Sequence, residues 1–185
     1  MNSSSTDSTD HSPIDDFSQC HVGIIAHLNS LGQLPALLEP AARARQIAAD
    51  TVTFFRDAVY EHHAEEEREL FPAVLASAAK GIERDKVQAI VAELTAEHRR
   101  VESAWSKLEP KLKAVAKGHD AEIDGAEVTA LVETYQAHAR YEEEVFLPLS
   151  QAILGRNSNH LAALGISMHM RHAMPEAMHR FAGRI

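Results

Sequence analysis

Residues 61–72 read EHHAEEERELFP, and 76 residues later the stretch 137–148 reads AHARYEEEVFLP. Both stretches contain a histidine that is followed four positions later by a glutamate, and both end in proline. Side chains four positions apart lie next to each other on one face of a helix. The repeat therefore predicts two helices, each of which presents an imidazole and a carboxylate on the same face.

The composition favours an all-helical domain. The chain has 185 residues, of which 45% are hydrophobic and only 5% aromatic, and this length suits one domain with a substantial core. Alanine, leucine and glutamate are abundant, whereas glycine and proline are sparse between residues 42 and 154. Such a composition is rich in helix formers and poor in strand formers.

Charge and cysteine content argue against several classes of function. The net charge is −9 with histidine neutral, so no basic surface is expected for nucleic acid. No apolar run approaches the ~20 residues of a membrane span, and the single Cys20 allows no internal disulfide. We therefore expect a cytoplasmic protein without a nucleic-acid or membrane partner, and no particular protein partner is indicated. Residues 1–14 are rich in Ser, Thr and Asp and are expected to form a disordered tail.

Proline and glycine divide the chain into four long segments, at roughly 15–33, 41–71, 83–117 and 125–154. In each segment apolar residues recur at alternating steps of three and four, which places them along one face of a helix. Four such helices with short connections form an up-down-up-down bundle. We therefore predict an all-α, four-helix bundle over residues 15–155.

Every predicted apolar stripe is interrupted at one level by a histidine. Glutamates follow one turn later in the second and fourth segments. With neighbouring helices antiparallel and ~1.5 Å of rise per residue, these levels agree to within a turn or two, so the side chains can converge in the core. The converging residues are His21, His62, Glu66, His98, His138 and Glu142.

A buried cluster of histidine and glutamate points to a metal site. A single histidine on an apolar face is usually an ordinary core residue, but unpaired buried carboxylates are costly. A divalent cation removes this cost, and imidazole nitrogen with carboxylate oxygen suits iron, manganese or zinc. Calcium and magnesium prefer oxygen ligands, and structural zinc commonly takes thiolates. Four histidines and two glutamates exceed the need of one tetrahedral ion and suit two ions bridged by carboxylates.

Together these motifs resemble the hemerythrin-like, HHE cation-binding domain family. The resemblance rests on His21, the HH-x-x-EE-x-x-LFP run at 62–72, the pair Glu97-His98 and the H-x-x-x-EEE-x-x-LP run at 138–148. It implies a four-helix bundle around a non-haem di-iron centre, with two iron ions for which zinc or manganese are substitutes. Glu66 and Glu142 would bridge the ions. The implied ligands are His21, His62, Glu66, His98, His138 and Glu142.

Two positions beside the implied ligands leave the assignment open. In the family the residue that corresponds to His63 sometimes also binds metal, but on an ideal helix it lies about 100° from the apolar stripe, so it ranks below His62. The same geometry ranks Glu67 below Glu66. Glu65 is expected on the solvated surface of the helix, where its replacement by alanine should have little effect.

One position departs from the oxygen-carrying members of the family, which have two histidines four apart on the third helix. Here Leu94 stands four positions before His98, and Glu102 stands four positions after it. The resemblance therefore predicts a centre with one histidine fewer, in which one ion keeps an open position or takes Glu102. Because hard oxygen ligands favour the ferric state, we expect oxidation by air or peroxide instead of reversible oxygen carriage.

The resemblance implies a small ligand, namely dioxygen, nitric oxide or peroxide, bound for sensing, detoxification or iron handling. Two other interpretations are open from the sequence. One is a di-iron enzyme that reduces peroxide or reactive nitrogen species, and the other is a bundle in which the metal is only structural. A ferritin-like protein is disfavoured, because the predicted core helices lack the paired Glu-x-x-His motifs of that class.

Residues 156–185 differ from the bundle in being rich in methionine and histidine. We expect a short helical extension whose apolar side chains pack on the bundle. The alternative is a site for a soft ion such as copper(I), which methionine and histidine can bind.

Overall fold

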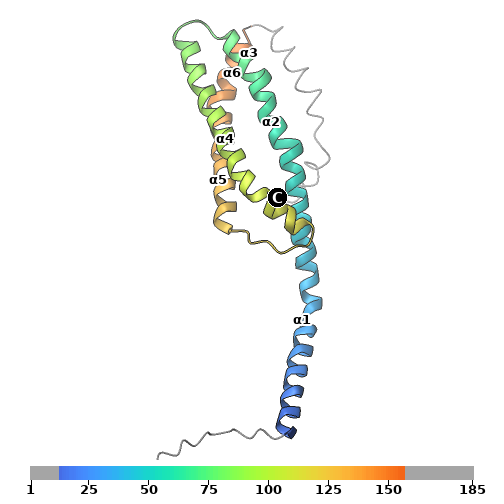
Figure 1. Cartoon of the computed structure of the whole chain (residues 1–185). Helices are drawn as coiled ribbons and strands as arrows, with labels where there is room; N and C mark the ends of the chain where they lie inside the picture. Colours follow the sequence, from blue (N-terminus) through green and yellow to red (C-terminus); the bar gives the residue numbers. More distant parts are fainter. Residues whose placement is uncertain (1–12, 157–185) are drawn as a thin grey trace, which may run out of the picture. The chain divides into compact units, whose positions relative to one another are not determined.

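The computed structural model describes residues 13–156, and all regular secondary structure in that range is helical (Figure 1). The prediction of an all-α protein is therefore confirmed for that range. No helix among these residues combines the length and the apolar character needed to cross a membrane. The chain divides into two compact units, Met1–Arg43 and Ala44–Ile185. The expected N-terminal tail and C-terminal extension lie outside the described residues, apart from residues 13, 14 and 156.

The described part of the first unit is the beginning of helix α1 (Pro13–Phe54), drawn in blue in Figure 1. The sequence predicted that a helix ends near Gly32 and Pro35. This prediction is wrong, because α1 continues through Pro35 and Pro40. A proline inside a helix removes one hydrogen bond and crowds the carbonyl four residues earlier. The backbone around both prolines belongs to exposed residues, so water can hydrogen-bond to the carbonyls that lose a partner.

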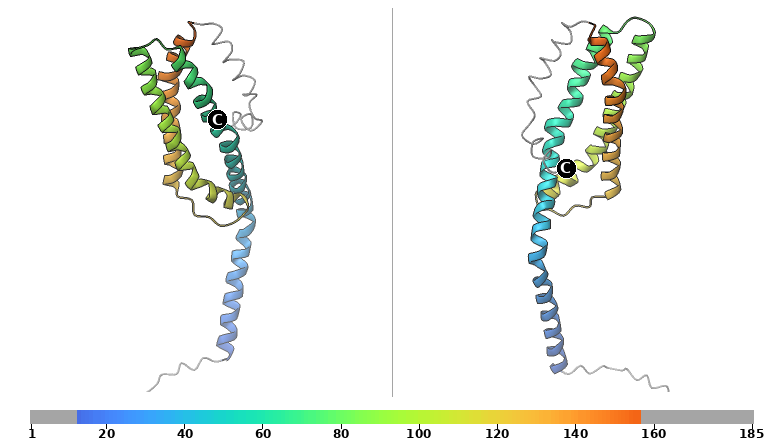
Figure 2. Two further views of the ribbon diagram at one scale, coloured as in Figure 1. Left: turned by 45° about the horizontal axis from the view of Figure 1, so that its top comes forward. Right: turned by 180° about the vertical axis from the view of Figure 1, so that it is seen from behind.

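Three helical rods make up the described part of the second unit (Figure 2). The second rod runs antiparallel to the other two and packs against both. The last two rods begin and end within one residue of the predicted segments 83–117 and 125–154. The rods consist of the end of α1 with α2 (Tyr60–Glu65) and α3 (Phe71–Ser77), then α4 (Ile82–Ala116), then α5 (Gly125–Tyr141) with α6 (Leu147–Leu154).

Local signals explain where α4 and α5 begin and end. The residue before α4 is Gly81, with φ of 90°, and Gly118 follows its end with φ of 77°. Both values lie in the left-handed region that glycine adopts without strain. The side chain of Asp124 caps α5 by accepting a hydrogen bond of 2.8 Å from the backbone nitrogen of Ala126, as N-cap aspartates do.

Short π-helical turns interrupt the first and third rods. They span Phe55–Val59, Glu66–Leu70 and Glu142–Phe146. The last two occupy equivalent positions in the sequence repeat, and in each case the proline of the repeat follows two residues later. A π-helical turn inserts one extra residue into a helix and is frequent at functional sites. In a regular α-helix the proline ring would crowd the carbonyl four residues earlier, which lies within each of these two turns.

Two apolar core clusters lie in the second unit. One is built around Phe71, Val74, Leu94 and Phe146, and the other contains Val101, Trp105, Leu108 and Leu131. Along α4 the two clusters are separated by the level of His98, because Leu94 and Val101 belong to different clusters. A layer of polar side chains therefore lies between two hydrophobic layers.

Candidate metal centre

Three buried histidines from three different helices meet in this polar layer. His63 of α2, His98 of α4 and His138 of α5 are 1%, 0% and 2% exposed. One ring nitrogen of each lies within 4.8 Å of those of the other two. The rings of His63 and His98 stack in parallel with their centroids 3.9 Å apart, and the His138 ring stands edge-on to His98 at 4.8 Å.

A second group contains one histidine and two glutamates. His62, Glu66 and Glu142 each offer a ligand atom within 4.8 Å of the other two. Nε2 of His62 lies 3.3 Å from Oε1 of Glu66 and 4.0 Å from Oε2 of Glu142. Both glutamates are buried, whereas the side chain of His62 is 37% exposed. The second group is therefore the more accessible of the two.

The carboxylate of Glu66 faces both groups. Its Oε1 is the atom near His62, while its Oε2 lies 3.2 Å from Nε2 of His98. A carboxylate that turns one oxygen to each of two sites is in a position to bridge two ions. This is the position that the predicted bridging role of Glu66 requires, and the role itself stays a prediction.

Several polar atoms in this layer are buried and have no hydrogen-bond partner. They include Nε2 of His63, His98 and His138 and Oε2 of Glu66. Nε2 of His98 and Oε2 of Glu66 are close, but their geometry is not that of a hydrogen bond. Buried polar atoms normally find partners, and lone pairs of imidazole and carboxylate directed at one place are suited to a divalent transition metal. The residues present therefore fit a metal centre.

The other ring nitrogen of each buried histidine is held by a glutamate. A carboxylate oxygen without a proton can only accept a hydrogen bond, so the tautomer with its proton on Nδ1 fits these contacts and leaves the lone pair of Nε2 for the centre. Such a partner orients a metal-binding imidazole. The Nδ1–oxygen pairs are His63 with Glu102 at 3.3 Å, His98 with Glu67 at 2.8 Å and His138 with Glu97 at 3.2 Å.

Burial and mutual proximity shift the pKa values of the inner groups. Burial, together with the adjacent carboxylate of Glu66, raises the pKa of Glu142 to about 9. Burial also raises the pKa of Glu66, but the nearby His98, Glu142 and His62 outweigh that effect and lower it to about 2. Burial and then the neighbouring His98 lower the pKa of His63 to about 4. At neutral pH His63 is therefore the neutral imidazole that binds metal ions.

The burial of neighbouring residues in the first motif differs from what an ideal helical period predicted, while their roles as ligands stay predictions. His63 was ranked below His62, yet His63 belongs to the buried three-histidine group and His62 to the more exposed second group. The π-helical turn at Phe55–Val59 shifts the register of the helix, so an ideal period does not describe this rod. Glu65 was expected on the solvated surface but is 5% exposed.

The three-histidine group does not include position 94, where Leu94 stands in place of the histidine of oxygen carriers. Leu94 is fully buried in an apolar core cluster, and His63, from another helix, supplies the third imidazole beside His98 and His138. Glu102, considered as a substitute ligand, contacts Nδ1 of His63 and belongs to neither group. The prediction that the centre has one histidine fewer than an oxygen carrier stays a prediction.

The remaining predicted ligand is His21 of α1. It lies in the first unit, its side chain is exposed, and it belongs to neither group of possible ligands found among the described residues. Its role as a ligand stays a prediction.

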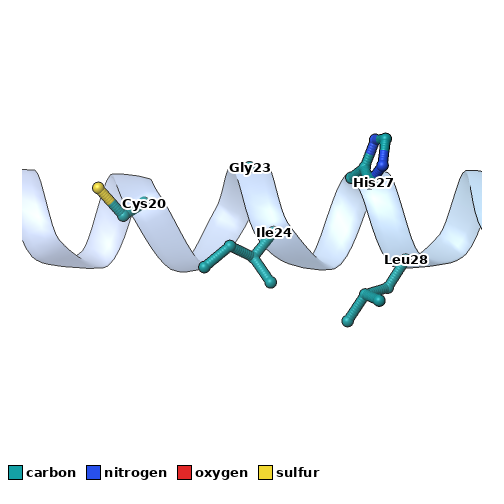
Figure 3. Close-up of a pocket in the computed structure, with 5 residues that line it drawn as sticks. All are labelled: Cys20, Gly23, Ile24, His27 and Leu28. Carbon is teal, nitrogen blue, oxygen red and sulfur yellow. The ribbon is translucent and has the colours of Figure 1, made fainter.

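The same exposed stretch of α1 carries a shallow depression (Figure 3). It is lined by Cys20, Gly23, Ile24, His27 and Leu28, which all come from one helix. One face of a single helix does not enclose a ligand, and ligand sites are usually concave and largely enclosed. The chemistry of the described residues is therefore concentrated in the second unit.

Comparison with known proteins agrees with this arrangement. The family model of the hemerythrin HHE cation binding domain matches residues 12–150, a range that contains both groups of possible ligands. Curated proteins and solved structures give no match. On the strength of the family match over most of its length, the chain belongs to the hemerythrin HHE cation-binding domain family.

Proposed function

We propose that this protein is a non-haem di-iron protein that binds dioxygen, nitric oxide or peroxide for sensing, detoxification or iron handling. The observation that carries the proposal is that Glu66, which belongs to the second group with His62 and Glu142, turns its other oxygen towards His98 of the three-histidine group. Such mixed nitrogen and oxygen donors suit iron, with manganese and zinc as competitors.

The two groups differ in a way that suits binding of a small molecule. Three buried imidazoles with one carboxylate oxygen would hold one ion in a closed environment. The second group offers fewer nitrogen atoms and includes the partly exposed His62. A bound iron ion there would supply a redox-active Lewis acid with positions for an external ligand. The residues of this group would bind the ion and leave a side open to solvent.

The up-down-up-down four-helix topology expected from the sequence would require a turn between residues 33 and 41, where α1 is continuous. The role of His21 as a metal ligand, also expected from the sequence, is kept as part of this proposal. Replacement of His21 by alanine should then lower the metal content, measured by elemental analysis against wild-type protein. Unchanged content would remove His21 from the ligand set and leave the other six residues as candidates.

Metal analysis combined with spectroscopy tests the proposal. Protein produced in iron-replete medium should contain about two iron ions per chain, the number expected for two bridged sites. The protein is then reduced without oxygen, exposed to air or to peroxide, and followed by its visible spectrum. We expect rapid oxidation to a stable ferric spectrum. Absence of metal, or a single zinc ion, would contradict the di-iron assignment.

Two outcomes of the same experiment would change the functional class. A visible band that forms in air and disappears reversibly when oxygen is removed would indicate an oxygen carrier. Continuous consumption of peroxide in the presence of a reductant would indicate an enzyme.

A further inference from the structure

An exposed arginine is connected to two of the three buried histidines. Arg99 follows His98 on α4, and its side chain is 55% exposed. Its Nη2 donates a hydrogen bond of 2.5 Å to Oε2 of Glu67, and its Nη1 donates one of 2.7 Å to Oε2 of Glu102. One guanidinium therefore holds a glutamate from the first rod and another from α4.

Each of these glutamates uses its second oxygen to hold an imidazole. Oε1 of Glu67 lies 2.8 Å from Nδ1 of His98, and Oε1 of Glu102 lies 3.3 Å from Nδ1 of His63. These are the two rings that stack in parallel. A continuous chain of contacts thus leads from one surface cation through two carboxylates to two nitrogen atoms of the buried group.

This connection has two physical consequences for the imidazoles. A carboxylate held by arginine in a fixed orientation is a better-defined acceptor than a freely rotating one. It keeps the proton on Nδ1, fixes the plane of the ring and increases the basicity of Nε2 as a ligand. An arginine that restrains two such carboxylates acts on both rings at once.

The third histidine is not connected to Arg99. Nδ1 of His138 contacts Glu97, and the arginine nearest to Glu97 is Arg100, at 3.6 Å. Arg100 makes its shorter contact, of 2.7 Å, with Glu93. Arginine therefore restrains the glutamates that contact His63 and His98 more tightly than the glutamate that contacts His138.

We propose that Arg99 is a positioning residue of the metal centre, which acts through Glu67 and Glu102 on His98 and His63 and so sets the affinity of the three-histidine group for a divalent cation. This inference rests on the proposed function, because it assumes that the three imidazoles bind metal.

The test compares Arg99→Met with Lys113→Met, an exposed cation on the same helix that pairs with Glu109. Metal-free proteins are titrated with Co²⁺ alone, without oxygen, and binding is followed by the visible absorption of the bound ion. The part of the wild-type absorption that is absent from His98→Ala is assigned to Co²⁺ bound at the three-histidine group. We expect Arg99→Met to bind Co²⁺ there about tenfold more weakly, at the lower end of the effect of outer partners, and with altered absorption. Lys113→Met should match wild type.

Further variants separate positioning from a general effect on the fold. Glu102→Ala should weaken Co²⁺ binding more than Glu102→Gln, because the glutamine oxygen can still accept a hydrogen bond from Nδ1. In a Glu67→Gln, Glu102→Gln background, Arg99→Met should have no additional effect, since coupled residues are not additive. The thermal midpoint of the metal-free protein should be the same with Arg99 or Met at this position.

The outcomes distinguish this inference from the proposed function. If wild-type protein binds Co²⁺ and Arg99→Met binds it equally well with the same spectrum, the positioning role is wrong and the metal centre stands. A full effect of Arg99→Met in the double-glutamine background would also overturn the role. If wild-type protein binds no Co²⁺, the metal centre itself is wrong, and the inference fails with it.

Discussion

His62 and His63 are adjacent in α2 but belong to different groups of possible metal ligands. His63 is enclosed between helices and stacks on His98. The side chain of His62, in contrast, reaches two buried carboxylates from a partly exposed position. Because their surroundings differ, the two histidines should make separable contributions to metal binding.

Alanine substitutions test this division. His63→Ala removes one of the three possible nitrogen ligands of the buried group, and His62→Ala removes the possible nitrogen ligand of the second group. Each variant should lose about half of the bound metal, since two bridged sites are expected. His62→Ala should also be less stable, because Glu66 and Glu142 then lack a partner at that side. Metal content by elemental analysis and thermal unfolding measure both effects, and wild-type content in both variants would contradict the assignment.

The burial of Glu65 leads to a different expectation from the one based on the sequence. Because Glu65 is only 5% exposed, its truncation to alanine leaves a cavity. Such changes typically lower the free energy of unfolding by about 0.5–3 kcal/mol. Glu65 is in neither group of possible ligands, so the metal content of the Glu65→Ala protein should remain that of wild type. Glu61→Ala, at an exposed position of the same helix, is the control. Equal urea midpoints for Glu65→Ala and Glu61→Ala would show that burial has no effect here.

At the scale of elements, the π-helical turns connect the repeat to the centre. Glu66 and Glu142 are the first residues of equivalent turns. Both turns are followed by a proline, which cannot donate a hydrogen bond, and the helices nevertheless continue as α3 and α6. The repeat therefore reproduces a backbone irregularity as well as a set of side chains, and it brings two carboxylates to the same level.

Glu83, near the start of α4, forms an ion pair with Arg156 and holds the end of α3. Its carboxylate accepts hydrogen bonds from Arg156, beyond the end of α6, and from the backbone nitrogen of Ala79. The Arg156 guanidinium, followed by the Ala79 bond, lowers the pKa of Glu83 from 4.5 to about 2. The lowered pKa means that the ionised form stabilises the fold above pH 4.5, and that this contribution is lost as the pH falls towards 2.

Glu83→Gln should therefore be less stable than wild type at pH 7, and the difference should disappear between pH 4.5 and pH 2. Urea unfolding at a series of pH values measures the difference. Glu133→Gln, at an exposed position of α5, should follow the wild-type pH dependence. A difference that persists unchanged at the acid end would rule out the ion pair as its source.

At the scale of the whole second unit, the polar layer links all three rods. The three-histidine group takes one residue from each rod, and the two apolar clusters lie on either side of it. A cation bound there would connect elements that are far apart in the sequence. Metal binding and folding are coupled in such an arrangement.

Removal of metal should consequently lower the thermal stability. At a free metal concentration of 100 times the dissociation constant, binding adds about 2.7 kcal/mol, which corresponds to roughly 5–10 °C in the melting temperature of a protein of this size. Differential scanning calorimetry before and after chelation, with metal added back, measures the change. An equal melting temperature in all three samples would show that the bound metal does not stabilise the fold.

Much of this protein was determined by its sequence alone. Helix-forming composition and apolar periodicity are local properties, and they predicted the bounds of the second and third rods and the meeting of His98, His138, Glu66 and Glu142. The HHE motif likewise predicted the family. The helix bounds followed from the positions of glycine and proline, the convergence of the side chains from their direction on a helix, and the family from the resemblance of the motifs.

Other features depended on the tertiary structure. The π-helical turns shift the helical register, so the sequence could not decide that His63 joins the buried group and that Glu65 is buried. In all three pairs, the glutamate that contacts Nδ1 lies on another rod than the histidine itself. Such partners are set by the rotation and height of one helix relative to another, which result from packing over the whole core and are not encoded in any single segment.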